Sequence, residues 1–209
     1  MFKKDFILAG VIGLITAIFA TPILYYSNNG HWTLSRYGFS IPIWYIFIIL
    51  PVAEYIAYTV ASKLFSHILI LRQLGRFFIT GLMNFCVDVG TGTFLSERFQ
   101  IDIKSNEFIP FLVLAAAVAV LNSYFWQRTW TFGERTKPSS KEFMSFILIT
   151  LIGFIINTSA TKIAIHSFGV LNLSNNAQLL SASKIAATGI SLFWNFFGYK
   201  FFVFKRARV

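Results

Sequence analysis

Six long apolar stretches constrain this chain more than any other feature of its sequence. Each approaches or exceeds the roughly 20 apolar residues that a helix needs to cross a lipid bilayer. The sequence therefore predicts an all-α integral membrane protein with six transmembrane helices. The predicted spans are Phe6–Tyr25, Pro42–Phe65, Phe77–Leu95, Phe108–Phe125, Phe143–Ile165 and Leu179–Tyr199.

Composition agrees with a membrane chain and excludes a soluble globular domain. Hydrophobic residues make up 56% of the 209 residues and charged residues only 12%, so the surplus apolar surface requires lipid. A net charge of +10 would indicate nucleic acid as the partner of a soluble chain. Here the basic residues flank apolar stretches, as cytoplasmic loops do, and we expect no nucleic-acid partner.

The Lys and Arg residues are distributed unequally between alternate loops, and this distribution predicts the orientation. One side holds Lys3, Lys4, Lys63, Arg72, Arg76, Arg128, Arg135, Lys137, Lys141, Lys200, Lys205, Arg206 and Arg208. The other side holds Arg36, Arg98, Lys104 and Lys162. Both termini are therefore predicted to face the cytoplasm. The basic stretch 67–76 is interpreted as a junction that could lie as a short amphipathic helix at the inner interface.

The chain also contains an internal repeat. Residues 122–132 (NSYFWQRTWTF) align from their last residue with 194–204 (WNFFGYKFFVF), and the segments that begin at Arg76 and Glu142 match as well. Internal repeats in membrane chains are typical of transporters, whose sites lie at the repeat interface. The sequence thus predicts an N-terminal helix pair, residues 1–71, followed by a four-helix unit, residues 72–209, made of two repeated helix pairs.

Polar residues follow one face of several predicted spans at spacings of three and four residues. The stripes are Thr80, Asn84, Asp88 and Thr91; Ala115, Ala119, Asn122 and Trp126; Thr150, Gly153, Asn157 and Thr161; and Ser181, Lys184, Thr188, Ser191, Asn195 and Gly198. Small and hydroxyl residues at such spacings favour close helix packing. The amide and charged residues among them also fit a polar pocket.

The charged residues inside the predicted spans need partners or a wet cavity, because an isolated charge in a bilayer costs several kcal/mol. Asp88 and Lys184 are predicted neighbours, either as a structural ion pair or as two walls of one polar pocket. Glu54 has no obvious partner, and either faces the repeated unit or stays protonated. Arg128 and Lys200 occupy equivalent repeat positions at the inner interface, where they fit phosphate binding.

Residues 76–204 resemble the GtrA-like family of small four-helix membrane proteins. The resemblance is carried by R-F-F-x-x-G-x-x-N-x-x-x-D from Arg76, R-x-W-T-F from Arg128, the segment Phe143–Asn157, and N-F-x-x-x-K-x-x-V-F from Asn195. It implies a role in moving or presenting polyprenyl-phosphate-linked sugars in the cytoplasmic membrane. It also implies a membrane glycosyltransferase as partner, which loads the carrier lipid on the inner side.

The leading functional hypothesis is translocation of a polyprenyl-phosphate-linked monosaccharide for cell-envelope glycosylation. The alternative is a membrane adaptor that presents substrate to a glycosyltransferase without transport. We expect no enzyme activity and no cofactor or metal, because the eight acidic residues form no cluster that metal-assisted chemistry would use. Transport would run downhill or be coupled to ions through Asp88 or Glu54, and size alone favours a homodimer. The predicted substrate-binding residues are Asn84, Asp88, Asn122, Arg128, Asn157, Lys184, Asn195 and Lys200.

Overall fold

The computed structural model describes residues 2–28, 30–36, 39–65, 67–102, 105–169 and 176–205. The chain divides into two compact units, Met1–Gly133 and Glu134–Arg208. We call them the N-terminal unit and the C-terminal unit and describe each by itself.

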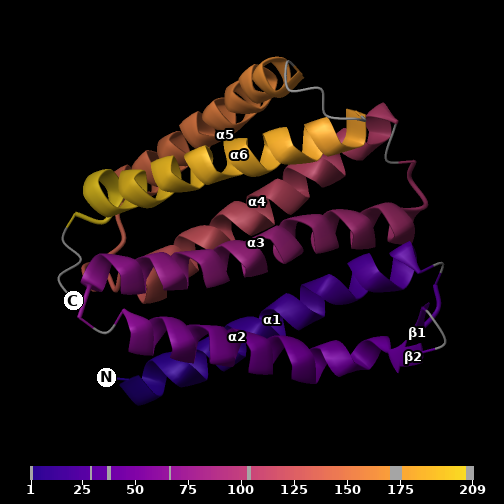
Figure 1. The fold of residues 1–209 in the computed structure, drawn as a ribbon, viewed down its shortest axis with the longest axis horizontal. Helices are drawn as coiled ribbons and strands as arrows, with labels where there is room; N and C mark the ends of the chain where they lie inside the picture. The colour runs from indigo at the N-terminus through magenta and orange to yellow at the C-terminus, as the bar shows by residue number, and fades with distance from the viewer. Residues whose placement is uncertain are drawn as a thin grey trace. The chain divides into compact units, whose positions relative to one another are not determined.

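The N-terminal unit is a group of four long helices with one short hairpin (Figure 1). Its elements are α1 (Phe2–Ser27), β1 (Thr33–Arg36), β2 (Phe39–Pro42), α2 (Ile46–Leu64), α3 (Leu69–Phe99) and α4 (Ile109–Trp126). Helix α1 packs against both α2 and α3, and α3 packs against α4. The strands pair antiparallel, with Thr33 opposite Pro42. A π-helix, Gln127–Thr131, continues directly from α4.

The C-terminal unit is a pair of long helices that pack against each other. It contains α5 (Ser140–Gly169), α6 (Asn176–Gly198) and a second π-helix, Tyr199–Val203, which continues from α6. The Phe146 ring stacks on Tyr199 with centroids 4.5 Å apart, and both side chains are buried. These rings hold the end of α6 against the beginning of α5.

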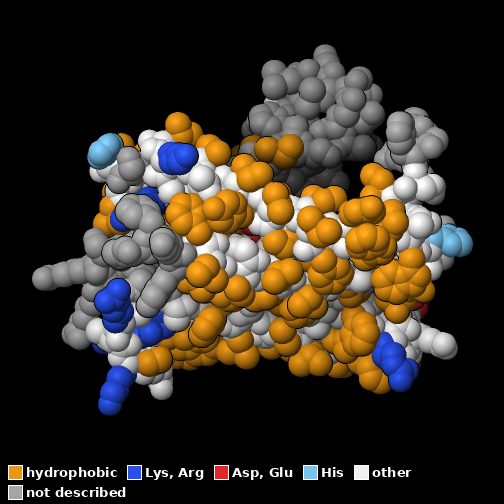
Figure 2. All heavy atoms as spheres, turned by 90° about the horizontal axis from the view of Figure 1, so that it is seen from below, with side chains coloured by type: hydrophobic (Ala, Val, Ile, Leu, Met, Phe, Trp, Pro, Cys, Tyr) orange, Lys and Arg blue, Asp and Glu red, His pale blue; other side chains and the backbone are white. Residues whose placement is uncertain are grey.

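The fold is an all-α integral membrane architecture, as the sequence predicts. Within the described residues, five helical stretches are long and apolar enough to cross a membrane. They are Asp5–Ser27, Ile43–Leu64, Leu69–Phe99, Asn106–Thr131 and Ser140–Ser167. Figure 2 shows apolar side chains gathered along the middle of the face below α1 and α2, with Lys and Arg side chains toward its ends. Six spans, the repeat and cytoplasmic termini stay predictions.

Two local expectations need correction or regrouping. The separate amphipathic helix at residues 67–76 is wrong, because α3 begins at Leu69 and runs without interruption through this stretch. Gln73 and Arg76 are buried in its first turns, so this segment packs inside the protein. The N-terminal helix pair also belongs to one compact unit with α3 and α4. The division at residues 71 and 72 stays a prediction about where the family unit begins.

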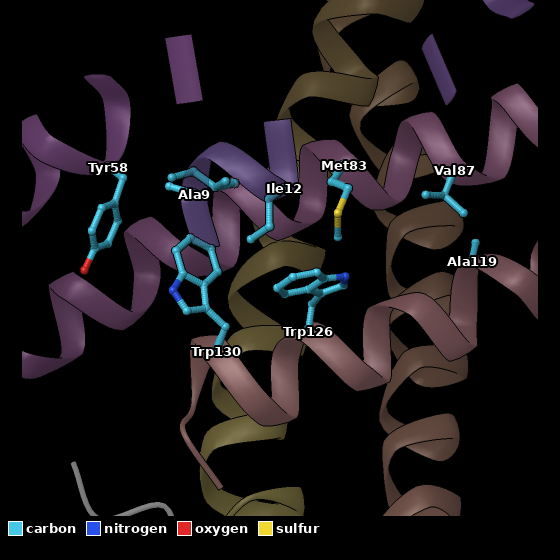
Figure 3. Close-up of a cluster of buried hydrophobic side chains, with 9 residues drawn as sticks. Ala9, Ile12, Tyr58, Met83, Val87, Ala119, Trp126 and Trp130 are labelled. Carbon is cyan, nitrogen blue, oxygen red and sulfur yellow. The ribbon is translucent and has the colours of Figure 1, made fainter. Parts of the chain in front are cut away.

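A cluster of buried apolar side chains joins all four helices of the N-terminal unit (Figure 3). Trp126 at the end of α4 and Trp130 in the π-helix point toward α1 and α3, next to Ile12 and Met83. Their large rings fill the space at this end of the cluster, whereas Ala119 lies further back along α4, beside Val87 of α3. The cluster therefore fixes the end of α4 from which the π-helix continues.

Two glycines set the closest helix crossings of this unit. A Cβ at Gly13 on α1 would collide with the backbone of Pro51 on α2. A Cβ at Gly90 on α3 would collide with the backbone carbonyl of Phe19 on α1. In membranes, helix association depends on such close van der Waals contact because lipid removes the hydrophobic driving force. The N-terminal helix pair therefore packs closely within itself at Gly13 and against α3 at Gly90.

Candidate functional site

Arg76, the first residue of the quoted family motif, lies in a closed cage within the N-terminal unit. Its Nη2 atom is 2.9 Å from Asp5 Oδ2 on α1 and 3.3 Å from the Tyr58 hydroxyl on α2. Its Nη1 atom donates to the Trp130 carbonyl at 3.0 Å. The guanidinium carbon also lies 5.7 Å from the ring centroids of both Tyr58 and Trp130. Arg76 thus ties α1, α2 and the π-helix to α3.

One turn further along α3, Thr80 is the centre of a second buried polar group. Gln127 Nε2 donates to Thr80 Oγ1 at 2.9 Å, and the Thr80 and Thr131 hydroxyls are 3.4 Å apart. All three side chains are buried. Buried polar groups of this kind must satisfy one another, because water does not reach them. The π-helix is therefore held to α3 by hydrogen bonds as well as by packing.

Predicted site residues Asn84 and Asn122 lie together one turn further along the same seam. Asn122 Nδ2 donates to Asn84 Oδ1 at 3.3 Å, joining α4 to α3. Asp88, the next residue of the α3 stripe, is half-buried. The described residues thus bring two of the three predicted residues of this seam into contact.

The two π-helices occupy aligned positions of the two repeat segments. Phe132 N donates to Gln127 O at 2.9 Å, and Phe204 N donates to Tyr199 O at 2.8 Å, which closes each wide turn in the same way. π-helices are rare and frequently mark functional sites. Each carries one predicted phosphate-binding cation. Arg128 is buried, and Lys200 is half-buried, so desolvation lowers the pKa of Lys200 from its ordinary value.

The seam between α5 and α6 carries a corresponding row of polar contacts. The Thr150 and Tyr199 hydroxyls are 2.8 Å apart. Asn157 Nδ2 donates to Ser191 Oγ at 3.1 Å and reaches Thr188 Oγ1 at 3.5 Å. Between these two contacts, Asn195 Oδ1 is buried without a hydrogen-bond partner among the described residues and lies against Gly153.

A polar pocket at one end of the C-terminal unit was not predicted from the sequence. It has a volume of about 540 Å³ and lies where the segment before α5 and the first turns of α5 meet the end of the second π-helix. Its lining residues are Glu134, Thr136, Lys137, Ser139, Lys141, Glu142, Ser145, Phe202, Val203 and Lys205. Sequence reasoning used these lysines only for orientation. The sequence did contain a signal for this pocket, because these lysines lie at the two ends of one helix pair. The two ends come together when α5 and α6 are antiparallel.

The pocket is held in shape by local hydrogen bonds of its own loop. The buried Glu134 carboxylate accepts from the Thr136 amide at 3.0 Å and from the Thr136 hydroxyl at 2.8 Å. Ser139 Oγ accepts from the Glu142 amide at 3.1 Å, which caps the beginning of α5. Lys137, Lys141 and Lys205 are exposed around this frame. Their ammonium groups can move toward an anion without disturbing the frame.

Two predicted charged residues have different outcomes. The side chain of Lys184 in α6 lies outside the described residues, so its pairing with Asp88 stays a prediction. Glu54 faces α1, where its Oε1 atom lies within hydrogen-bond distance of Thr16 Oγ1, at 2.8 Å. Among the described residues, no group of three or more His, Cys, Asp or Glu side chains could hold a metal ion.

Comparison with known proteins agrees with the resemblance in the sequence motifs. The family model described as "GtrA/DPMS, transmembrane domain" matches residues 76–204. An uncharacterized membrane protein of Bacillus subtilis (strain 168), YngA, is 31% identical over 135 residues, which cover 64% of this chain and 80% of the relative. No solved structure matches the chain. The family match begins at Arg76, inside its cage, and ends just past the second π-helix, so it covers more than half of the chain. The chain therefore belongs to the GtrA/DPMS transmembrane-domain family of multi-pass membrane proteins.

Proposed function

We propose that this chain translocates a polyprenyl-phosphate-linked monosaccharide across the cytoplasmic membrane for cell-envelope glycosylation. The family itself points to processes that involve glycosyl lipids. Such a lipid has a polar head that cannot cross hydrocarbon unaided and an apolar tail that never has to leave it. A translocator therefore needs a site that receives the head and a polar seam along which the head can move.

The pocket of the C-terminal unit is the observation that carries this proposal. Its volume of about 540 Å³ falls in the range of small-molecule sites, roughly 300–1,000 Å³. Three lysines supply mobile positive charge for a phosphate. The carboxylates and hydroxyls of the same lining fit sugar hydroxyls, and Phe202 offers an aromatic face. Together they suit a glycosyl phosphate better than a simple anion.

The polar contacts between α5 and α6 begin beside this pocket and continue away from it. Ser145 lines the pocket, and Thr150, Gly153 and Asn157 follow on the same helix. At 1.5 Å per residue, Asn157 lies about 18 Å further along α5 than Ser145. The contacts along this row are weak neutral hydrogen bonds, which sugar hydroxyls can replace one by one. The row supports a path for the head group.

The predicted substrate-binding residues have graded roles in this proposal. Arg128 on the first π-helix and Lys200 on the second each attract phosphate in their own unit. Along the helices of the N-terminal unit Asn84, Asn122 and Asp88 bond the sugar and head group, and Asn157, Asn195 and Lys184 do so in the C-terminal unit. The carrier is loaded by a partner membrane glycosyltransferase, and no catalytic step is assigned to this chain. A homodimer stays an expectation from size.

The test is reconstitution into liposomes that carry a polyprenyl-phosphate glucose probe in both leaflets. A membrane-impermeant sugar oxidant reports how fast inner-leaflet probe becomes accessible. We expect acceleration by the wild-type chain and a loss of about tenfold or more in the triple variant Lys137→Gln, Lys141→Gln, Lys205→Gln, because removal of about 1.4 kcal/mol of binding corresponds to tenfold. The matched control replaces two exposed cations outside the pocket, Arg98→Gln and Lys162→Gln, and should behave as wild type.

The adaptor alternative gives a different result in the same assay. A folded wild-type chain that binds the probe but never accelerates its exposure would contradict translocation and favour presentation to a glycosyltransferase. Equal loss in the pocket variant and the control variant would instead mean that general charge, rather than the pocket, accounts for the effect.

A further inference from the structure

Glu54 is a buried carboxyl in the N-terminal helix pair, outside the residues that match the family. Its side chain is 4% exposed and that of its partner Thr16 is 1% exposed. The two side chains meet across the α1–α2 seam. Thr16 lies three residues after Gly13 on α1, and Glu54 lies three residues after Pro51 on α2, where Gly13 and Pro51 form the close crossing. Ionisable residues inside a span are expensive to keep and mark functional sites.

The hydrogen bonds around Thr16 indicate which form of Glu54 this seam holds. Thr16 Oγ1 is 2.9 Å from the Ile12 carbonyl oxygen and 2.8 Å from Glu54 Oε1. The carbonyl oxygen can only accept a hydrogen bond, and so can Glu54 Oε1 if the carboxyl group is charged. A hydroxyl has a single hydrogen and donates one strong bond. Each contact is a full hydrogen bond when Thr16 donates to Ile12 and a protonated Glu54 donates to Thr16.

The described surroundings of Glu54 contain no cation that would stabilise a negative charge on its carboxyl group. Its Oε2 atom is buried without a hydrogen-bond partner, and no Lys or Arg forms an ion pair with it among the described residues. From α3, the titratable group on this side is the Cys86 thiol, which is buried. On α2 itself, Tyr58 lies one turn away, and its hydroxyl accepts from Arg76, which already pairs with Asp5 on α1.

We propose that Glu54 is a proton-binding site through which head-group transport is coupled to proton movement; the coupling rests on the proposed function. In the packed seam, the carboxyl keeps its proton and donates to Thr16. When the seam opens to water, the O–H bond breaks, the proton passes to water, and the carboxylate is hydrated. The seam closes again only after Glu54 recovers a proton.

The helices are suited to such an opening at this point. Pro51 lacks the amide hydrogen that would bond the carbonyl four residues earlier, so α2 bends at low cost one turn before Glu54. Gly13 opposite it carries no side chain that would lock the crossing. Gln at position 54 would preserve the shape and the donor to Thr16 but could release no proton. A purely structural hydrogen bond therefore predicts that Gln is a full substitute, whereas a proton site predicts that it is not.

The first experiment detects the proton directly by infrared spectroscopy of the full chain in lipid. A protonated carboxyl has a C=O stretch that is separate from the carboxylate bands and shifts in heavy water. We expect wild type at neutral pH to show such a band that Glu54→Gln removes and that Thr16→Val shifts in frequency. Glu107→Gln, at an exposed glutamate, is the control and should leave it unchanged. A spectrum in which neither change alters any band would overturn the proposal.

The second experiment measures translocation of the same lipid-linked glucose probe with and without a pH gradient across the liposome. We expect the gradient to change the wild-type rate several-fold and to leave the Glu54→Gln rate unaffected, while Glu107→Gln follows wild type. A gradient effect that persists in Glu54→Gln would refute the coupling. If wild type never moves the probe, the proposed function fails, and the infrared band still decides whether Glu54 holds a proton.

Discussion

Arg76 and Asp5 form a buried ion pair, 2.9 Å between Nη2 and Oδ2, that joins a family motif to a helix outside the matched family region. The two side chains are only 7% and 15% exposed, so water screens the pair weakly. The N-terminal helix pair is consequently part of the same packed unit as the first half of the family domain.

Loss of this ion pair should destabilise the protein strongly. Arg76→Met leaves the Asp5 carboxylate without its partner and removes the donor to the Trp130 carbonyl. Breaking a buried pair by deleting one member costs about 3–5 kcal/mol. Unfolding in mixed detergent micelles should show this loss. The control Arg98→Met, at an exposed residue of the same helix, should change stability little, and equal effects would contradict the buried role of Arg76.

Gly90 should not tolerate even a methyl group. Gly90→Ala places its Cβ against the Phe19 carbonyl and forces α1 away from α3, which we expect to cost about 1–3 kcal/mol. Gly81→Ala is the matched control on the same helix, because no atom lies within 4 Å of the added Cβ. Thermal unfolding in detergent should separate the two variants. A Gly90→Ala midpoint equal to that of Gly81→Ala would show that the crossing is looser than described.

Removal of the Thr80 hydroxyl should release the first π-helix. Thr80→Val keeps the shape but leaves the buried Gln127 amide without its acceptor, a loss of about 1–3 kcal/mol. Thr129→Val makes the same chemical change at an exposed position, whose hydroxyl bonds only the backbone of its own helix, and should be nearly neutral. Hydrogen exchange of residues 127–132 is the sensitive measurement. Unchanged protection there in Thr80→Val would argue against the hydrogen-bonded attachment.

Gly153 should affect transport more than stability. In Gly153→Ala the new methyl group meets the end of the Asn195 side chain, which can rotate away and so lose its position in the predicted path. We expect a drop of about tenfold in probe translocation with a small change in unfolding midpoint. Gly189→Ala, on the facing helix with open space at its Cβ, is the control and should retain activity. A variant that transports normally would remove Asn195 from the set of substrate-binding residues.

The sequence was sufficient for the membrane class because apolar stretches of about 20 residues have few other uses. The spacing of polar residues placed Asn84 and Asn122 each in a stripe on one face of its helix, and the structure shows a hydrogen bond between them that the spacing did not predict. The sequence did not predict that Arg76 is buried. A cation at the end of an apolar stretch is normally assigned to the interface, and the partner Asp5 is 71 residues away. Contacts at such separations depend on how helices pack, which composition does not report.

The pocket and the π-helices escaped sequence reasoning for related reasons. Lys137 and Lys205 lie far apart in sequence and line one pocket only after α5 turns back as α6. The two π-helices differ in residue type, QRTWT in the first and YKFFV in the second, so no residue type shared by both marks the wider turn. The sequence did not decide whether Glu54 faces the repeated unit or stays protonated, because its neighbour Thr16 belongs to another helix.

The two wide turns make the chain sensitive to length at particular places. Successive residues of an α-helix are rotated by about 100°, and a wide turn takes up one extra residue without rotating the residues that follow it. Phe132 and Phe204 are both buried just beyond such a turn. Regular α-helical bonding over an unchanged number of residues would therefore swing each aromatic ring to another side. Relatives whose helices lack the wide turn should accordingly have one residue fewer at this place.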